Sequence, residues 1–168
     1  MSPSCYDLKS DRVSSPAENK QRYGKKMEYL IGLILASAVA GAANVIGFDR
    51  ERSFYSTVLI VIAAYYVLFA AMGASDSTLV AEIAVAGGFS VLAVLGFKKN
   101  LWFAAAAVIG HGVFDYVHHF LIDNPGVPRW WPGFCGSFDV IFGLYLATLL
   151  LRRPASTFNS GDVRTNGS

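Results

Sequence analysis

Residues 54–73, FYSTVLIVIAAYYVLFAAMG, form a long apolar stretch without a single charged side chain. About 20 apolar residues in a helix cross the roughly 30 Å hydrocarbon core of a bilayer. A lone strand is excluded because it would leave backbone N–H and C=O groups unpaired in lipid. This stretch therefore predicts a membrane-spanning helix.

The same pattern recurs on both sides of this stretch, at residues 29–48, 78–97, 101–122 and 133–151. No proline interrupts any of these segments, and the connections between them are short except for residues 123–132. Short connections place consecutive helices antiparallel. The sequence thus predicts an all-α fold, an up-down membrane bundle of about five transmembrane helices.

The composition agrees with a membrane protein. The chain is 54% hydrophobic and 15% charged, whereas a soluble domain carries about 25% charged residues. The net charge of +2 gives no indication of nucleic-acid binding, so the expected partner is the lipid bilayer, with a lipid-like small molecule as a further partner. We expect a multi-pass protein of the cell membrane.

The polar ends of the chain predict disordered tails at residues 1–26 and 154–168, leaving residues 27–153 as the transmembrane domain. The segment 29–48 also has an alternative interpretation as a cleaved signal peptide, because it follows basic residues and contains small-residue sites. Lys and Arg flank both ends of the bundle in similar numbers, so the positive-inside rule assigns no orientation.

Ionisable residues inside the apolar segments carry the functional information. The segment 101–122 contains all three histidines of the chain, His111, His118 and His119, together with Asp115. At 100° per residue these four side chains share one stripe of a helix. An ionisable group in hydrocarbon costs about 2.5–3.5 kcal/mol on insertion scales, so the stripe is expected to face the bundle interior.

Two further carboxylates fall at matching depth. With a rise of 1.5 Å per residue, Asp115 lies roughly 10 Å, Asp139 roughly 9 Å and Glu82 roughly 6 Å from the same end of the bundle. We therefore expect His111, Asp115 and one of His118 or His119 to face inward, with Asp139 and Glu82 pointing toward them. Asp115 and Asp139 are expected to approach most closely.

Three functions remain open for this cluster. It can be a hydrogen-bonded network that fixes helix packing, or a relay for protons or ions. It can also be a Zn or Fe site, because imidazole and carboxylate suit these metals; the candidate ligands are His111, Asp115, His118, His119 and Asp139. In the third case metal-activated water would attack a lipid ester or amide, with Asp115, Asp139 and Glu82 as candidate catalytic carboxylates.

Other residues have packing as their first interpretation. Gly32, Ala36 and Ala40, like Ser37 and Gly41, are spaced for close helix contact, and Gly87-Gly88 flattens a patch of the segment 78–97. Cys135 is interpreted as a small buried hydrophobe, with a ligand or nucleophile as the alternative. Trp130 and Trp131 suit the headgroup level, or alternatively line an entrance to the polar pocket.

The block His111-Gly112-x-x-Asp115, continued by Asn124-Pro125-Gly126-Val127-Pro128-x-Trp130-Trp131-Pro132-x-Phe134-Cys135 and Asp139, resembles a signature of small, mainly bacterial polytopic membrane proteins without an established activity. That resemblance implies an architecture and no mechanism. The His/Asp stripe is also loosely similar to the metal-binding histidines and aspartate of alkaline ceramidase-like membrane hydrolases. Those proteins have more helices, and their motifs are spread over several of them.

Overall fold

The computed structural model describes residues 16–152 and consists, over that range, of helices and their connections. Five α-helices and one short 3₁₀ helix follow in the order α1 (Pro16–Ile46), η1 (Phe48–Arg50), α2 (Arg52–Gly73), α3 (Asp76–Lys98), α4 (Leu101–Leu121) and α5 (Trp131–Arg152). The predicted all-α bundle is confirmed, and the bounds of the last four helices agree with the predicted segments to within two residues.

Four of the five helices contain stretches long and apolar enough to cross a membrane: Lys26–Ile46 within α1, Arg52–Gly73, Asp76–Lys98 and Trp131–Arg152. Helix α4 is of similar length but is not among these spans, and its buried residues include His111, Asp115 and His118. It is also the helix with the most buried polar side chains, which indicates that its neighbours shield it from lipid.

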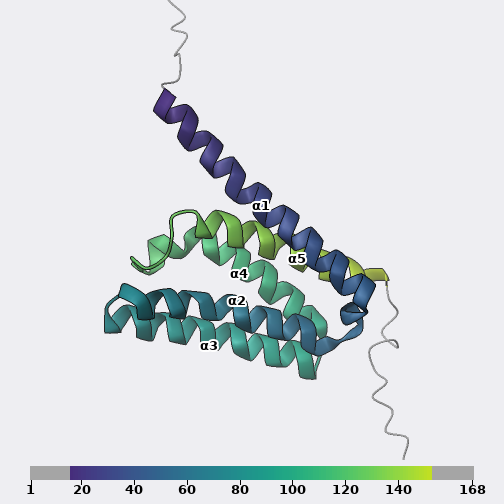
Figure 1. Ribbon diagram of the computed structural model, residues 1–168. Coiled ribbons are helices and arrows are strands. Elements are labelled where there is room, and N and C mark those ends of the chain that lie inside the picture. The colour runs from purple at the N-terminus through teal and green to yellow at the C-terminus, as the bar shows by residue number, and fades with distance from the viewer. Residues whose placement is uncertain (1–15, 153–168) are drawn as a thin grey trace, which may run out of the picture.

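Consecutive helices run in opposite directions (Figure 1). Helices α2 and α3 pair along their length, α4 lies between that pair and α5, and α1 crosses the outer side of α5. Short connections are stabilised by caps: the Ser75 hydroxyl accepts from the Thr78 amide at 3.2 Å, and the Asn100 side chain accepts from the Trp102 amide at 3.0 Å.

Helix α1 differs from the prediction at both ends. It begins at Pro16, so residues 16–26 belong to a helix and the expected disorder is wrong there. It ends at Ile46 because Gly47 adopts a φ of 92°, a left-handed conformation that favours glycine. The predicted disorder of residues 1–15 and 154–168 lies outside the described residues.

The contact between α1 and α5 uses one of the two predicted small-residue patterns. A side chain on Gly32 would meet the Ser137 hydroxyl and the Phe134 carbonyl, and Ala36 is fully buried. Ser37 and Gly41 are instead exposed on the other side of α1. Gly87 and Gly88 are exposed as well, with no atom within 4 Å of a Cβ built on either residue.

Candidate metal centre

The buried face of α4 is brought close to α5 by two glycines. A Cβ on Gly112 would lie 2.9 Å from both the Asp139 Cβ and the Gly136 carbonyl oxygen, and a Cβ on Gly136 would lie 3.0 Å from the Gly112 carbonyl. Neither position can carry a side chain without separating the helices. This close approach places Asp139 of α5 directly beside His111 of α4.

Four buried side chains meet at this contact: His111, Asp115, Cys135 and Asp139. Their ligand atoms all lie within 4.8 Å of one another. The Asp139 Oδ2 atom is central, 2.7 Å from His111 Nδ1 and 3.9 Å from Cys135 Sγ. His111 Nδ1 also lies 3.8 Å from Asp115 Oδ1.

This cluster has the ligand atoms that a metal ion needs, and some of them lack another partner. Ligands held about 2.0–2.3 Å from a tetrahedral zinc ion lie roughly 3.5 Å from each other. The contacts here are 2.7, 3.8 and 3.9 Å long, so His111 and Asp139 would separate slightly to admit an ion. Asp115 Oδ2 and Asp139 Oδ1 are buried and have no hydrogen-bond partner among the described residues. Buried carboxylate oxygens are expensive to leave unpaired, so a cation fits the arrangement. The cluster could hold a metal ion.

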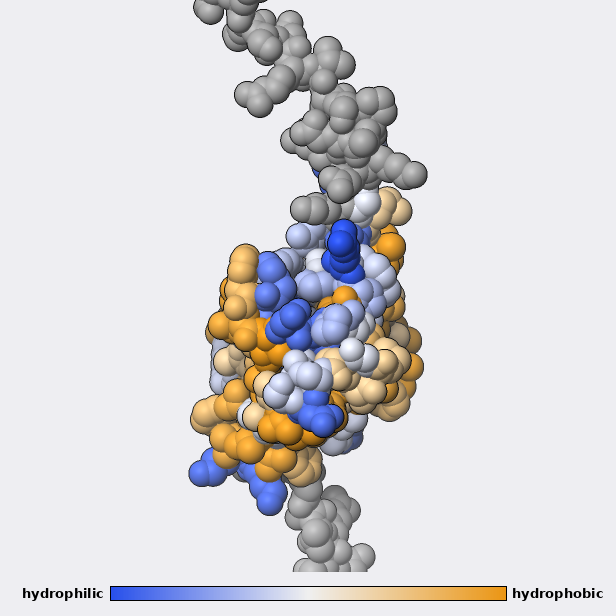
Figure 2. All heavy atoms as spheres, turned by 90° about the vertical axis from the view of Figure 1, so that its left-hand side faces the viewer, coloured by the Kyte–Doolittle hydropathy of each residue, from blue (hydrophilic) through white to orange (hydrophobic). Residues whose placement is uncertain are grey.

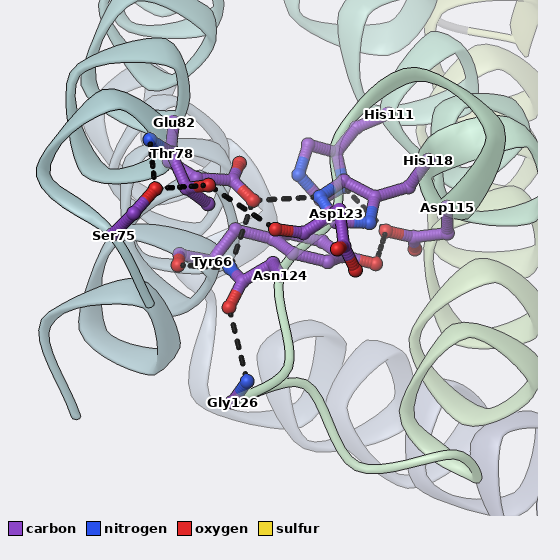
Figure 3. A network of polar contacts seen from close by, with 10 residues as sticks. All are labelled: Tyr66, Ser75, Thr78, Glu82, His111, Asp115, His118, Asp123, Asn124 and Gly126. Carbon is purple, nitrogen blue, oxygen red and sulfur yellow. Dashed lines mark hydrogen bonds and ion pairs between the residues drawn. The ribbon is translucent and has the colours of Figure 1, made fainter. Parts of the chain in front are cut away.

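A second polar pair lies nearer the end of the bundle (Figure 3). His118 Nε2 of α4 lies 2.7 Å from Glu82 Oε1 of α3, and the Asn124 side-chain amide donates to the same oxygen at 2.8 Å. Glu82, His118 and Asn124 are all buried. This second group contains a single carboxylate and a single imidazole, which is fewer ligands than the first group offers. Its other carboxylate oxygen, Glu82 Oε2, is also buried without a hydrogen-bond partner among the described residues.

Tyr66 of α2 joins the two groups. Its hydroxyl donates to Asp115 Oδ1 at 2.7 Å, and its ring lies over the His118 ring with centroids 4.1 Å apart. Its backbone carbonyl accepts from the Asn124 side chain at 3.2 Å. One tyrosine therefore orients a carboxylate of the first group and packs against the imidazole of the second.

The α4–α5 connection covers this end of the bundle as a defined turn. The Val127 amide donates to the Asn124 carbonyl at 3.1 Å, and the Gly126 amide donates to the Asn124 side chain at 3.2 Å. Gly126 is packed directly on the Phe69 carbonyl of α2, where a Cβ would not fit. Thr78 of α3 donates to the Asp123 carbonyl at 3.1 Å. The connection is thus held by both α2 and α3.

The residues expected to face inward do so. The structure selects His118 over His119, and it differs from the expectation in which side chains approach most closely. His118 faces the interior, whereas His119 is exposed and lies outside both groups. Asp115 and Asp139 do belong to one group, but the shortest contacts join carboxylates to imidazoles instead. The predicted ligands are therefore divided, because His118 is occupied by Glu82.

Three participants are not assigned to the cluster as the first interpretation of the sequence. The sequence favours a small buried hydrophobe at Cys135, with a ligand or nucleophile as the alternative, and the thiol belongs to the first group. The sequence gives no functional role to Tyr66 or Asn124. The four-residue step from Cys135 to Asp139 places both on one face of a helix, and this spacing is the signal that could have identified the thiol.

The surface above the second pair is polar. A hollow of about 400 Å³ is lined by residues that include Glu28, His118, His119, Asn124 and Arg129. The corresponding end of the bundle shows hydrophilic residues across its middle and hydrophobic residues along its flanks (Figure 2). Trp131 faces away from this hollow, packing on Tyr65 and Phe69 of α2 with ring centroids 5.0 and 4.9 Å apart.

No family model, curated protein or solved structure matches this chain.

Proposed function

We propose that the protein is a metal-dependent membrane hydrolase that acts on an ester or amide of a lipid-like substrate. The observation that carries this proposal is the group of four buried donors with two unpartnered carboxylate oxygens at the α4–α5 contact. An imidazole, a thiol and carboxylates together suit Zn or Fe. Four apolar spans around such a group favour a substrate that reaches it through lipid.

The donors divide into ligands and a proton acceptor. His111 and Cys135 both lie next to Asp139 Oδ2, and these three residues would hold the ion. Three protein ligands leave a fourth position for water, as in catalytic zinc sites. Asp115, oriented by the Tyr66 hydroxyl, is then the free carboxylate that accepts the proton of the attacking water. A bound metal lowers the pKa of its water toward 7.

In the proposed reaction the oxygen of water adds to the substrate carbonyl carbon. The bond from that carbon to the ester oxygen or amide nitrogen breaks, and the proton taken up by Asp115 passes to the leaving group. The products are a carboxylic acid and an alcohol or amine. Glu82, a candidate catalytic carboxylate by sequence, has a positioning role here because its contacts are with His118 and Asn124.

Metal analysis of the detergent-purified protein tests the site. We expect one zinc or iron ion per chain, retained in the His119→Ala control and reduced more than about tenfold in His111→Ala and Asp139→Ala. A metal-free wild-type protein, or full occupancy in His111→Ala, would overturn the metal site.

Release of acid from ester and N-acyl amide lipids in mixed micelles should be lost in Asp115→Asn while its metal content stays. Metal-loaded wild-type protein that cleaves neither lipid class would overturn the hydrolase.

The second pair favours another candidate function, a proton relay without metal. His118, Glu82 and Tyr66 extend from the polar hollow toward Asp115, and alternating imidazoles and carboxylates can carry protons. Vesicles containing metal-free protein would then conduct protons, and His118→Ala would abolish the conductance. For either function we propose that the protein lies in the cell membrane. Fractionation of cell membranes checks this location.

A further inference from the structure

An apolar groove opens between α1 and α2. Helix α1 packs on α5 and diverges from α2 (Figure 1), leaving a space of about 390 Å³ whose floor is α5. Its walls include Leu35 and Val39 of α1 and Val58 and Val61 of α2. Val61 is 49% exposed, so in a bilayer the groove opens directly to lipid. We call this space the α1–α2 groove.

The floor of the α1–α2 groove reaches the candidate metal centre. Cys135 lines the groove, and its thiol lies 3.9 Å from the Asp139 carboxylate. One of the four donors therefore lines an opening to lipid directly, and the other three lie behind it.

The wall at one end of the groove contains a buried polar atom. Trp131 lines the groove, and the Trp131 indole nitrogen is buried without a hydrogen-bond partner among the described residues. Tyr65 lies beside it, with ring centroids 5.0 Å apart. An unpartnered buried N–H group is costly, and a carbonyl oxygen in the groove would accept from it once the Trp131 ring shifts to expose its nitrogen. The remaining wall toward Phe54 is apolar.

The length of the groove matches one lipid chain. From Phe54 to Tyr65 the groove follows α2 for roughly 16 Å at 1.5 Å per residue. A hydrocarbon core of roughly 30 Å holds two leaflets, so one acyl chain spans about 15 Å. The volume is within the range of small-molecule sites.

We propose that the α1–α2 groove binds one acyl chain of a lipid. The carbonyl group lies at Trp131 and Cys135, and the hydrocarbon extends along α2 toward Phe54. The proposal rests on the proposed function only for cleavage of the bound lipid at the metal centre, because the groove itself requires no metal.

A second hollow on the lipid-facing surface serves as a control for the α1–α2 groove. This hollow lies between α2 and α3 and is lined by residues such as Ile60, Ala64 and Ile83. It contains none of the four donors of the metal centre. Ile60 and Val61 are adjacent on α2, are 39% and 49% exposed, and face different hollows.

Photocrosslinking tests the proposal on the full chain in phosphatidylcholine nanodiscs. The probe is a phosphatidylcholine with a diazirine in one acyl chain, and labelled positions are mapped by peptide mass spectrometry. We expect several-fold more label at the α1–α2 groove, including the peptide with Cys135, than at the α2–α3 hollow. Equal labelling of the two hollows would show ordinary contact with bulk lipid and overturn the proposal.

A matched pair of substitutions sharpens the result. Val61→Trp fills the α1–α2 groove and should remove most label from the Cys135 peptide, whereas Ile60→Trp should leave it unchanged. Equal metal content in both variants and the wild type shows that they are folded, and gel filtration serves if the protein is metal-free. Groove labelling in a metal-free protein would overturn the proposed function alone. Uniform labelling of a metal-loaded protein would overturn only this inference.

Discussion

At the scale of single residues, the core of this bundle depends on carboxylates paired with imidazoles. His111 with Asp139 and His118 with Glu82 are both 2.7 Å apart and buried. Removing one member of a buried pair leaves the other charge or dipole without compensation, which costs more than the pair contributes. Each pair should therefore be sensitive to the loss of either partner.

The neighbouring histidines at the end of α4 provide a direct test. His118→Ala leaves Glu82 with Asn124 as its remaining partner, and we expect the free energy of unfolding to fall by about 3 kcal/mol or more. His119→Ala removes an exposed ring and should change it by less than about 0.5 kcal/mol. Reversible unfolding in mixed micelles measures both. Equal losses in the two variants would contradict the assignment of His118 as the buried member.

At the scale of helices, α1 is attached to the rest of the bundle mainly through α5. Gly32 lies against the Phe134 backbone and the Ser137 side chain of α5, while Gly41 on the same helix has open space around it. Close backbone approach of this kind replaces the hydrophobic effect as the source of helix association in lipid.

Two glycine-to-alanine substitutions on α1 separate the effect of the α1–α5 contact on stability from the effect of helix propensity. Gly32→Ala should destabilise the protein by about 1–3 kcal/mol, because the added methyl group displaces α1 from α5. Gly41→Ala adds the same atom to an open position and should be neutral or slightly stabilising, since alanine favours the helix. Thermal unfolding in detergent, followed by tryptophan fluorescence, measures the difference. A destabilised Gly41→Ala with an unaffected Gly32→Ala would refute the contact.

At the scale of the whole molecule, large apolar side chains cover much of the outer surface, and the carboxylates of the candidate metal centre are buried inside. Large side chains such as Val45, Leu68 and Val80 are mostly exposed, whereas Asp115 and Asp139 are fully buried. This distribution is stable in a bilayer, where apolar side chains meet lipid and polar groups must find partners inside the protein.

Extraction of membranes checks this distribution. We expect the full chain to stay in the membrane pellet after alkaline carbonate treatment and to dissolve only in detergent, because four apolar spans anchor it. A peripheral protein in the same fraction should be released and serves as the control. Release of intact chain into the carbonate supernatant would contradict a multi-pass membrane protein.

The helices themselves could be predicted from the sequence. The bounds of α2 to α5 follow from the length of each apolar stretch and from capping residues such as Ser75 and Asn100, which are local properties. The start of α1 could not be predicted in this way, because residues 16–26 are polar and have no apolar stretch to mark them as helix.

By itself, the sequence determined that the ionisable residues face inward and at which depth, because the cost of charge in lipid and the rise of a helix require no knowledge of neighbours. The tertiary structure decided which of them meet. His119 lies about 100° around the helix from His118, and the rotation of α4 against its neighbours exposes it. Cys135 joins His111 because Gly112 and Gly136 let α4 and α5 approach. That approach is a property of two helix surfaces together, which neither segment encodes alone.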